Sequence, residues 1–397
     1  MAQDKEIRYY GSAMELLEDL HKDGITGYEL KKEFDKFLDL QARMRGVPIN
    51  VGFELTPLCN FDCKMCYVHL TKEQMEKEGH VLTTEQWLDI MSQAVDAGML
   101  HADLTGGECL THPGFKQLYL YLHSHGIQIS VLTNGLLIDE EMADFFAKNP
   151  PSLVQITVYG SNEDAYERVT GRRAFADVLA AIERLKQRNI RVMLTITPSR
   201  YTQEDTHALL TLLRSLKVKY GVGGVMLPAR EDTDRRIDTY TPEYELCVKI
   251  QEDERDYSFS LTETAKRGKI QPAPRKQIER IPKNFSPHSG IPCASGQSTC
   301  HINWKGEMQP CIPFYTVARS VLQYGYADAW QWVTKTMASF KPPEECRGCK
   351  MLPLCRSCTA EKTSGVLNGP LNRAVCHRYT SYLEAGIIEL AEKESCI

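Results

Sequence analysis

The 397-residue sequence lacks the features that mark membrane, secreted and nucleic-acid-binding chains. It contains no run of about 18 apolar residues, so no membrane-spanning helix is predicted. No positively charged stretch followed by an apolar one opens the chain, so no signal peptide is predicted. The formal net charge is −5 without long runs of one sign, which predicts neither a basic nucleic-acid-binding face nor an acidic tail. We therefore expect a cytoplasmic protein that binds neither membranes nor nucleic acids.

Cysteine is the residue type that stands out in an otherwise ordinary globular composition. Apolar residues make up 42% and charged residues 25% of the chain, which is typical of soluble proteins. The 14 cysteines include three near the start and eight between residues 293 and 376. In a reducing compartment, such clusters indicate metal binding or catalysis rather than disulfides.

Strand and helix patterns alternate through the first half of the chain. Residues 1–48 predict a charged N-terminal helical extension, and residues 49–230 predict six β–α units. The predicted strands are 51–55, 102–105, 127–133, 153–158, 192–197 and 222–227. The predicted helices are 84–97, 113–125, 139–148, 175–188 and 205–216. This alternation predicts an α/β fold, a partial (β/α)6 TIM-like barrel with a parallel sheet inside and helices outside.

The second half breaks this alternation, and no other internal repeat is present. Residues 231–290 predict a linker or covering segment, in which Lys266 to Lys283 hold seven basic residues, one acid and three prolines. These charges either meet an acidic peptide or belong to a solvated linker. Residues 291–385 predict a cysteine-rich iron–sulfur domain, followed by a tail at 386–397.

Three cysteines with the spacing Cys59-x3-Cys63-x2-Cys66 follow the first predicted strand. Loops at the carboxyl ends of barrel strands carry the chemistry of such folds. A 4Fe–4S cluster has four iron sites that thiolates normally fill, so three cysteines leave one iron open to a small chelating molecule. Zinc with His69 as fourth ligand is the alternative. The position of the loop, with Tyr67 after the last cysteine, favours the cluster.

The segment ELTPLCNFDCKMCY resembles the signature of the radical S-adenosylmethionine (SAM) superfamily, and the resemblance covers residues 50 to about 230. In that family the methionine moiety of SAM binds the open iron. One electron then breaks a carbon–sulfur bond and gives a 5′-deoxyadenosyl radical, which takes a hydrogen atom from substrate. The resemblance implies Cys59, Cys63 and Cys66 as catalytic cluster ligands. It also implies SAM as cofactor and an electron donor of the flavodoxin or ferredoxin type.

Gly106, Gly107 and Glu108 resemble the family's GGE segment, which meets the amino group of the cofactor. Glycines let the backbone approach a ligand closely, and a carboxylate can accept from an ammonium group. A simple strand-to-helix turn is the alternative. Cys109 follows where proline is commoner in the family. It is either a small buried residue or a thiol at the radical site.

Four further residues match cofactor-binding positions of the family, each with a structural role as the alternative. Tyr67 follows the cysteine motif, and Thr157 lies where the family often has a serine that meets the cofactor. Arg168 matches an arginine that can pair with the cofactor's carboxylate, a role for which Arg172 competes. Asn134 either contacts the ribose or stabilises its turn.

The eight later cysteines satisfy two 4Fe–4S clusters or two zinc ions equally well by number. Their order, with a Gly-x4-Cys segment and a four-cysteine run, resembles the SPASM extension of radical SAM enzymes. Two residues separate the last pair of that run where three are usual. The resemblance implies an inner auxiliary cluster and an outer one, and so three 4Fe–4S clusters in all. The inner set would be Cys293, Cys300, Cys311 and Cys358; the outer set would be Cys346, Cys349, Cys355 and Cys376.

The SPASM resemblance implies that a ribosomally made peptide or protein is crosslinked or oxidised, with the auxiliary clusters relaying electrons. Sulfatase maturation is a minor alternative, because Ile312 stands where that activity is associated with aspartate. The N-terminal extension is shorter than the leader-recognition domain of many members. Either a separate leader-binding protein or a small-molecule substrate is therefore expected. A non-catalytic zinc or iron–sulfur scaffold is the alternative of another class.

Overall fold

The computed structural model describes most of the predicted barrel and part of the cysteine-rich region. Four of the predictions above, for the segment 231–290, the tail 386–397, Cys355 and Cys376, lie outside the described residues. The described residues are 12–22, 24, 26–197, 199, 201–222, 293–347, 349 and 358–373.

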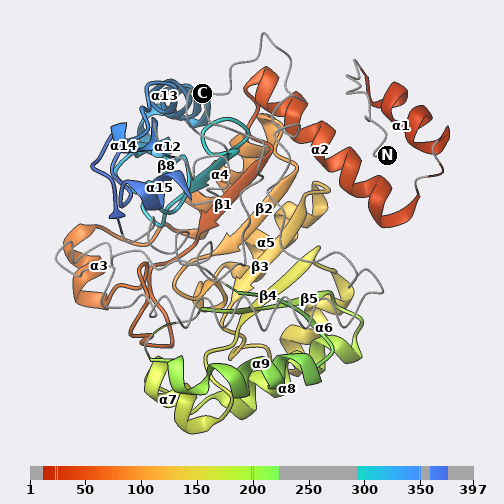
Figure 1. Ribbon diagram of the computed structural model, residues 1–397, viewed down its shortest axis with the longest axis vertical. Helices are drawn as coiled ribbons and strands as arrows, with labels where there is room; N and C mark the ends of the chain where they lie inside the picture. The colour runs from red at the N-terminus through yellow and green to blue at the C-terminus, as the bar shows by residue number, and fades with distance from the viewer. Residues whose placement is uncertain are drawn as a thin grey trace.

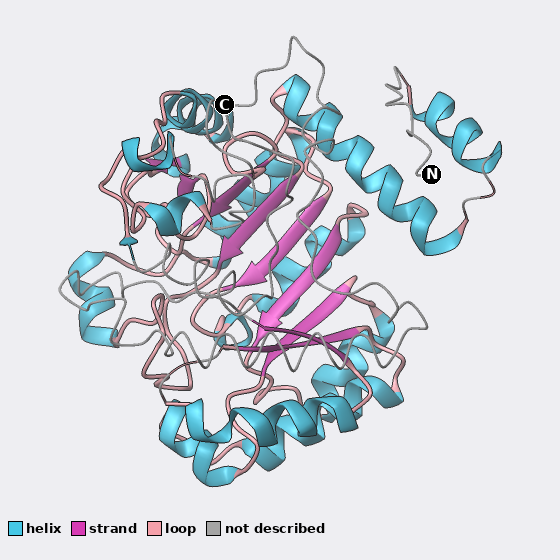
Figure 2. Ribbon diagram, viewed as in Figure 1, coloured by secondary structure: helices cyan, strands magenta, loops and turns pink. Residues whose placement is uncertain are grey.

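One sheet of nine strands forms the centre of the described structure (Figure 2). Its strands are β1 Asn50–Glu54, β2 His101–Thr105, β3 Gln128–Thr133, β4 Leu153–Thr157, β5 Val192–Ile196, β6 Lys219–Val222, β7 Thr299–Ile302, β8 Glu307–Gln309 and β9 Arg319–Ser320. The order across the sheet is β6-β5-β4-β3-β2-β1-β7-β8-β9. Strands β1 to β6 are parallel to their neighbours, which confirms the predicted α/β fold.

Helices follow most of the parallel strands and cover the outer face of the sheet (Figure 1). The helices are α1 Ala13–Lys22, α2 Gly27–Arg45, α3 Lys72–Glu78, α4 Thr84–Asp96, α5 Phe115–Ser124, α6 Glu140–Lys148, α7 Glu163–Thr170, α8 Phe175–Gln187, α9 Thr206–Ser215, α12 Val321–Tyr324, α13 Tyr326–Ala338, α14 Glu344–Arg347 and α15 Thr359–Lys362. Short 3-10 turns are η1 Cys109–Thr111 and η2 Gln203–Asp205. No helix among the described residues is long and apolar enough to cross a membrane.

Alternating burial along β2, β3 and β4 distinguishes a packed face of the sheet from a more exposed one. In β3 every second residue, Ile129, Val131 and Thr133, is buried. Successive strand residues point to opposite faces, so these side chains lie on one face of the sheet. The intervening residues of β3 are more exposed and belong to the inner face of the partial barrel. The face of β3 that carries Ile129, Val131 and Thr133 therefore belongs to the packed core.

The helix starts follow from capping chemistry that the sequence displays. Thr83 precedes α4, where its hydroxyl accepts from the backbone N–H of Gln86 at 3.3 Å. The side chain of Gln86 accepts in return from the N–H of Thr83 at 2.9 Å, which completes a capping box. The predicted helix 84–97 is confirmed to within one residue.

The structure differs from the sequence expectations at the sixth strand, in helices that no predicted element covered and in the pairing of β7. The sixth strand begins at Lys219 rather than at Val222, and residues 223–227 lie outside the described residues. The helices α3 and α7, which no predicted element covered, have only 7 and 8 residues, which is shorter than the window in which helical periodicity is read. In addition, β7 from the cysteine-rich region pairs in parallel with β1 and extends the barrel sheet.

Candidate active site

The cysteine loop, residues 59–66, leaves the carboxyl end of β1 and is fixed by hydrogen bonds to α7. The backbone N–H of Asp62 donates to the carbonyl of Thr170 at 2.9 Å. The N–H of Lys64 donates to the carbonyl of Val169 at 3.0 Å. The last carbonyls of a helix have no partner within the helix, so they are free to accept these bonds. The C-terminal end of α7 thus positions the loop that carries the three thiols.

The two glycines after β2 permit a close approach between two loops. The N–H of Gly107 donates to the carbonyl of Thr56 at 2.7 Å, and the N–H of Glu108 to that of Leu58 at 2.9 Å. A Cβ atom at Gly106 would lie 2.5 Å from the oxygen of Thr56, and one at Gly107 would lie 2.3 Å from the oxygen of Leu58. The glycines are therefore required where the GGE segment meets the chain just before Cys59.

The carboxylate of Glu108 points inward and joins the loops after β2 and β3. It is fully buried and accepts from the hydroxyl of Thr133 at 2.7 Å and the N–H of Asn134 at 2.8 Å. It also accepts from the N–H of Leu110 at 3.1 Å. Burial raises the pKa of Glu108, while these three donors favour its ionised form. Glu108 is thus a positioning residue in this structure, and its contact with a cofactor stays a prediction.

The thiols of the cysteine loop receive hydrogen bonds from nitrogen donors. The N–H of Phe61 lies 3.4 Å from the sulfur of Cys59, and the N–H of His69 lies 3.3 Å from that of Cys66. Burial raises the pKa of Cys63, and the thiols of Cys66 and Cys59 raise it further. Hydrogen bonds to sulfur tune the reduction potential of iron–sulfur clusters. The donor set therefore fits a thiolate-bound cluster.

Asn134 links the turn after β3 to the cysteine loop. Its Nδ2 donates to Oδ1 of Asn60 at 2.6 Å and lies 3.7 Å from the sulfur of Cys59. Its Oδ1 accepts from the N–H of Leu136 at 3.0 Å, which is the turn role considered above. The Nδ2 of Asn60 is buried and has no acceptor among the described residues. A sulfur-rich cluster beside Cys59 would offer acceptors to this donor.

The remaining sequence-predicted residues differ in how closely the structure ties them to the loop. Thr157 ends β4, at the same edge of the sheet as the loop, and Tyr67 is half-buried directly after the loop. Arg168 is exposed on α7, and its Nε donates to the carbonyl of Tyr201 at 3.4 Å. Arg172, its competitor, is exposed just beyond α7. Cofactor contacts of these side chains stay predictions.

Cys109 and His69 receive clear structural roles. The Cys109 thiol is fully buried and donates to the carbonyl of Leu132 at 3.4 Å, which confirms its interpretation as a small buried residue. The imidazole Nδ1 of His69 lies 3.7 Å from a carboxylate oxygen of Asp62. The ring of His69 thus lies beside a carboxylate, which does not favour the zinc alternative.

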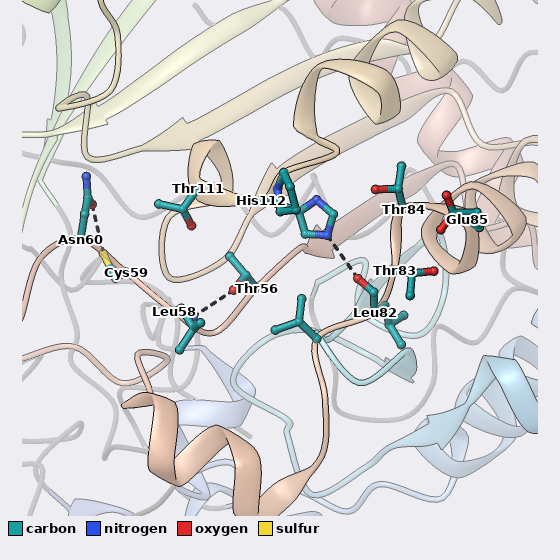
Figure 3. A pocket seen from close by; sticks show the side chains of 12 residues that line it. Thr56, Leu58, Cys59, Asn60, Leu82, Thr83, Thr84, Glu85, Thr111 and His112 are labelled. Carbon is teal, nitrogen blue, oxygen red and sulfur yellow. Dashed lines mark hydrogen bonds between the residues drawn. The ribbon is translucent and has the colours of Figure 1, made fainter.

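A cavity of about 640 Å³ adjoins the cysteine loop on the side of α4. Figure 3 shows Cys59 and Asn60 at one end, Thr84 and Glu85 at the other, and His112 between them. The ring of His112 is held by a hydrogen bond between Nε2 and the carbonyl of Leu82 at 3.2 Å. This cavity brings accessible space up to the first cysteine.

Comparison with known proteins agrees with this geometry. The sequence profile of the Radical SAM superfamily matches residues 53–213. Residues 53–213 form a radical SAM domain. This domain holds the cysteine loop, the GGE segment and Asn134, so the motifs that carried the resemblance all belong to it.

The curated relatives of the radical SAM domain include peptide-modifying and other enzymes. The chain is 28% identical over 188 residues to the sporulation killing factor maturation protein SkfB of Bacillus subtilis. That alignment covers 47% of this chain and 45% of SkfB, so the chain spans about half the length of this relative. It is 24% identical over 330 residues to the AdoMet-dependent heme synthase of Methanosarcina barkeri, covering 80% and 93% of the two chains.

Solved structures extend the likeness beyond the radical SAM domain. The structure of Streptococcus suis SuiB bound to S-adenosylmethionine superposes with a TM-score of 0.64 at 16% identity. The superposition covers 91% of this chain and 86% of SuiB. At this identity the likeness shows a shared fold, which includes the partial barrel.

The C-terminal cysteines are only partly brought together by the described residues. Burial raises the pKa of the Cys311 thiol to about 12, and the neighbouring thiols Cys358 and Cys293 contribute. The sulfur of Cys300 lies 3.6 Å from the hydroxyl oxygen of Tyr326. Of the expected outer set, Cys346 is buried in α14 and Cys349 is exposed, whereas Cys355 and Cys376 lie outside the described residues.

The inner face of the radical SAM domain carries polar side chains that the sequence analysis missed. Glu54 and His301 are 1% and 3% exposed, with 3.4 Å between Oε2 and Nε2. Asp103 on β2 is exposed, yet its pKa is raised by desolvation, which is expected for a side chain in a hollow. The sequence did contain a pattern that indicates this polar face, because polar residues recur at every second position in β2.

Proposed function

We propose that the cysteine loop binds a 4Fe–4S cluster and that the enzyme cleaves SAM reductively to begin a radical reaction. When bound, the cluster and SAM supply a 5′-deoxyadenosyl radical that takes a hydrogen atom from the substrate. One observation carries this proposal. The GGE segment, Asn134 and Cys59, the first of the three cysteines, are linked by hydrogen bonds at the carboxyl edge of the sheet.

The residues of this chain hold the site together rather than supply the radical. Cys59, Cys63 and Cys66 are the proposed iron ligands, and backbone N–H groups at Phe61 and His69 stabilise charge on sulfur. The open iron of a three-cysteine cluster is the proposed place for SAM. A flavodoxin- or ferredoxin-type protein is the proposed electron donor.

The proposed substrate is a ribosomally made peptide or protein that is crosslinked or oxidised. The relative SkfB is a maturation protein, and SuiB has also been solved bound to its precursor peptide SuiA. The exposed Asp103 on β2 offers a polar contact to such a substrate. We propose that the auxiliary clusters accept the electron that remains after hydrogen abstraction.

Metal analysis combined with a cleavage assay tests the proposal against the scaffold alternative. Anaerobically reconstituted protein should hold about twelve irons and twelve sulfides, three cubanes in all. After reduction and addition of SAM it should release 5′-deoxyadenosine. Zinc without sulfide, together with no release of 5′-deoxyadenosine, would show that the chain is a metal scaffold and not an enzyme.

A small-molecule substrate is the second candidate, because the heme synthase alignment covers 80% of this chain and 93% of that enzyme. Short peptides encoded beside the gene can be tested as substrates to distinguish the two candidate functions. After incubation with reduced enzyme and SAM, mass spectrometry should detect loss of hydrogen from one such peptide. Intact peptides in a reaction that still consumes SAM with a small molecule would favour the second candidate.

A further inference from the structure

We propose that the side chain of Asn134 donates a hydrogen bond to the sulfur of Cys59 and so raises the reduction potential of the cysteine-loop cluster, with Asn60 holding its amide in place. Asn134 is then a positioning residue of the cluster rather than a ribose ligand. This inference rests on the proposed function, since it concerns the cluster that the function requires. It gives Asn134 a role that the sequence analysis did not consider.

The hydrogen bonds around Asn134 fix the direction of its amide group. The backbone N–H of Leu136 donates to this side chain at 3.0 Å, so the atom on that side must be the oxygen Oδ1. The nitrogen Nδ2, on the other arm of the amide, lies 2.6 Å from Oδ1 of Asn60 and 3.7 Å from the sulfur of Cys59. An amide nitrogen carries two hydrogens and can donate to both acceptors. Both side-chain donors of Asn134 are thus directed at the cysteine loop.

Deprotonation of Cys59 makes its sulfur depend on these donors. As a thiol, Cys59 can itself donate to Oδ1 of Asn60, which lies 3.7 Å away (Figure 3). A metal-bound cysteine is a thiolate and has no hydrogen to donate. Its sulfur then accepts from Nδ2 of Asn134 and from the backbone N–H of Phe61 at 3.4 Å. Each donor stabilises the negative charge that reduction adds, so Asn134 should raise the reduction potential.

The burial of Asn134 leaves little of it for a ribose to contact. The residue is 6% exposed, and its backbone N–H donates to Oε2 of Glu108 at 2.8 Å. Together with the two side-chain donors, this bond engages every hydrogen that Asn134 can donate. A ribose oxygen would have to displace one of these partners to receive a hydrogen bond. Glu108 also accepts from the hydroxyl of Thr133 at 2.7 Å, which fixes the turn from which the amide reaches Cys59.

Asn60 is the second member of this amide pair. Its Oδ1 accepts from Asn134, which leaves its Nδ2 as a buried donor without an acceptor among the described residues. An unsatisfied buried donor is costly, so a group that accepts from it is expected to bind here. A cluster held by the neighbouring Cys59 supplies sulfur acceptors beside this residue.

Variants at the two asparagines test the inference. Asn134→Ser keeps an oxygen that can accept from the N–H of Leu136, but it lacks the amide nitrogen that reaches Cys59. Asn60→Ala removes the acceptor that holds this amide. In redox titrations without SAM, both variants should show a more negative midpoint potential of the cysteine-loop cluster than the wild type. The double variant should shift the potential by less than the sum of the two single shifts, because residues in contact act together.

Electron paramagnetic resonance (EPR) spectroscopy distinguishes this cluster from the auxiliary ones. SAM is proposed to bind at its open iron, so the spectral component that changes on addition of SAM belongs to it. Asn303→Ser is the matched control. The Oδ1 of Asn303 accepts from the N–H of Lys305 at 3.0 Å in a similar turn, but its Nδ2 donates to the carboxylate of Glu307 at 2.8 Å. This control should keep the wild-type potential of that component.

The outcomes separate the roles open to Asn134. A wild-type potential together with weaker SAM binding in Asn134→Ser would overturn the inference and assign Asn134 to the cofactor. A wild-type potential with unchanged SAM binding would overturn it too and leave Asn134 as a turn residue only. Iron analysis and circular dichroism identify the variants that are loaded and folded. If Asn134→Ser does not hold a cluster, the potential of Asn60→Ala decides, and a wild-type value there overturns the inference.

Failure of the proposed function gives a different result. A wild-type protein whose EPR spectrum does not respond to SAM, and which releases no 5′-deoxyadenosine, would remove the catalytic cluster and this inference with it. A wild-type protein that cleaves SAM, combined with equal potentials in all variants, would overturn the inference alone.

Discussion

The two cysteine-rich regions position sulfur atoms in different ways. Cys59, Cys63 and Cys66 lie on one loop, which hydrogen bonds fasten to α7. Cys293 precedes β7, Cys311 follows β8 and Cys358 precedes α15, so these cysteines come from three separate segments. A ligand set on one loop can be predicted from spacing alone. A distributed set depends on strand register, which spacing does not reveal.

Removal of ligands from the outer auxiliary set should have the largest effect on product formation. Cys346→Ala combined with Cys349→Ala should stop product formation while some cleavage of SAM continues, because the electron acceptor is lost and the cysteine loop is intact. The measurement is the ratio of modified substrate to 5′-deoxyadenosine. Cys396→Ala, a cysteine apart from both groups in sequence, is the control.

The folded state of the double variant must be checked first, since loss of a metal site can unfold a small domain. Product formed at the normal rate by the folded double variant would make the outer cluster structural only. The contrast between a catalytic loop and an electron-relaying C-terminal region would then have to be abandoned.

The substitution Gly107→Ala should disrupt the cysteine loop, although Gly107 itself lies outside that loop. The added Cβ would lie 2.3 Å from the carbonyl oxygen of Leu58, so the chain before Cys59 must shift. A shift of about 1 Å can lower a rate roughly 100-fold, and we expect a loss of SAM cleavage of that order in Gly107→Ala. Gly221→Ala is the matched control, because a Cβ there meets no atom within 4 Å. Equal rates for the two variants would contradict the close approach.

The smallest expected effect is that of the buried carboxylate. Glu108→Gln places an amide where the carboxylate accepts from Thr133 and Asn134, so at least one donor loses its acceptor. The free energy of unfolding should fall by about 1–3 kcal/mol. Thermal melting measures the change, with the exposed Glu76→Gln as control. A melting temperature equal to that of the wild type would show that Glu108 does not join the loops.

The sequence predicted the barrel well because its signals are local. The apolar pattern at residues 153–158 predicted the strand Leu153–Thr157, and the pattern at residues 84–97 predicted α4. The pairing of β1 with β7 was not predicted, because it joins residues about 250 positions apart in sequence.

The candidate site shows the same division between local and long-range information. The three cysteines and the GGE segment were evident from spacing. The inward direction of the Glu108 side chain was not evident from spacing. Its carboxylate accepts hydrogen bonds from Thr133 and Asn134, which belong to β3 and the turn after it. The pairing of His301 with Glu54 likewise requires strand register that spacing alone does not contain.

The most direct test of the central claim is 5′-deoxyadenosine release by a variant in which Cys59, Cys63 and Cys66 are all alanine. The account predicts no release from this variant after reduction and addition of SAM. It also predicts that about eight of twelve irons remain, because the auxiliary clusters keep their ligands. Undiminished release of 5′-deoxyadenosine would contradict the account and place the catalytic cluster elsewhere in the chain.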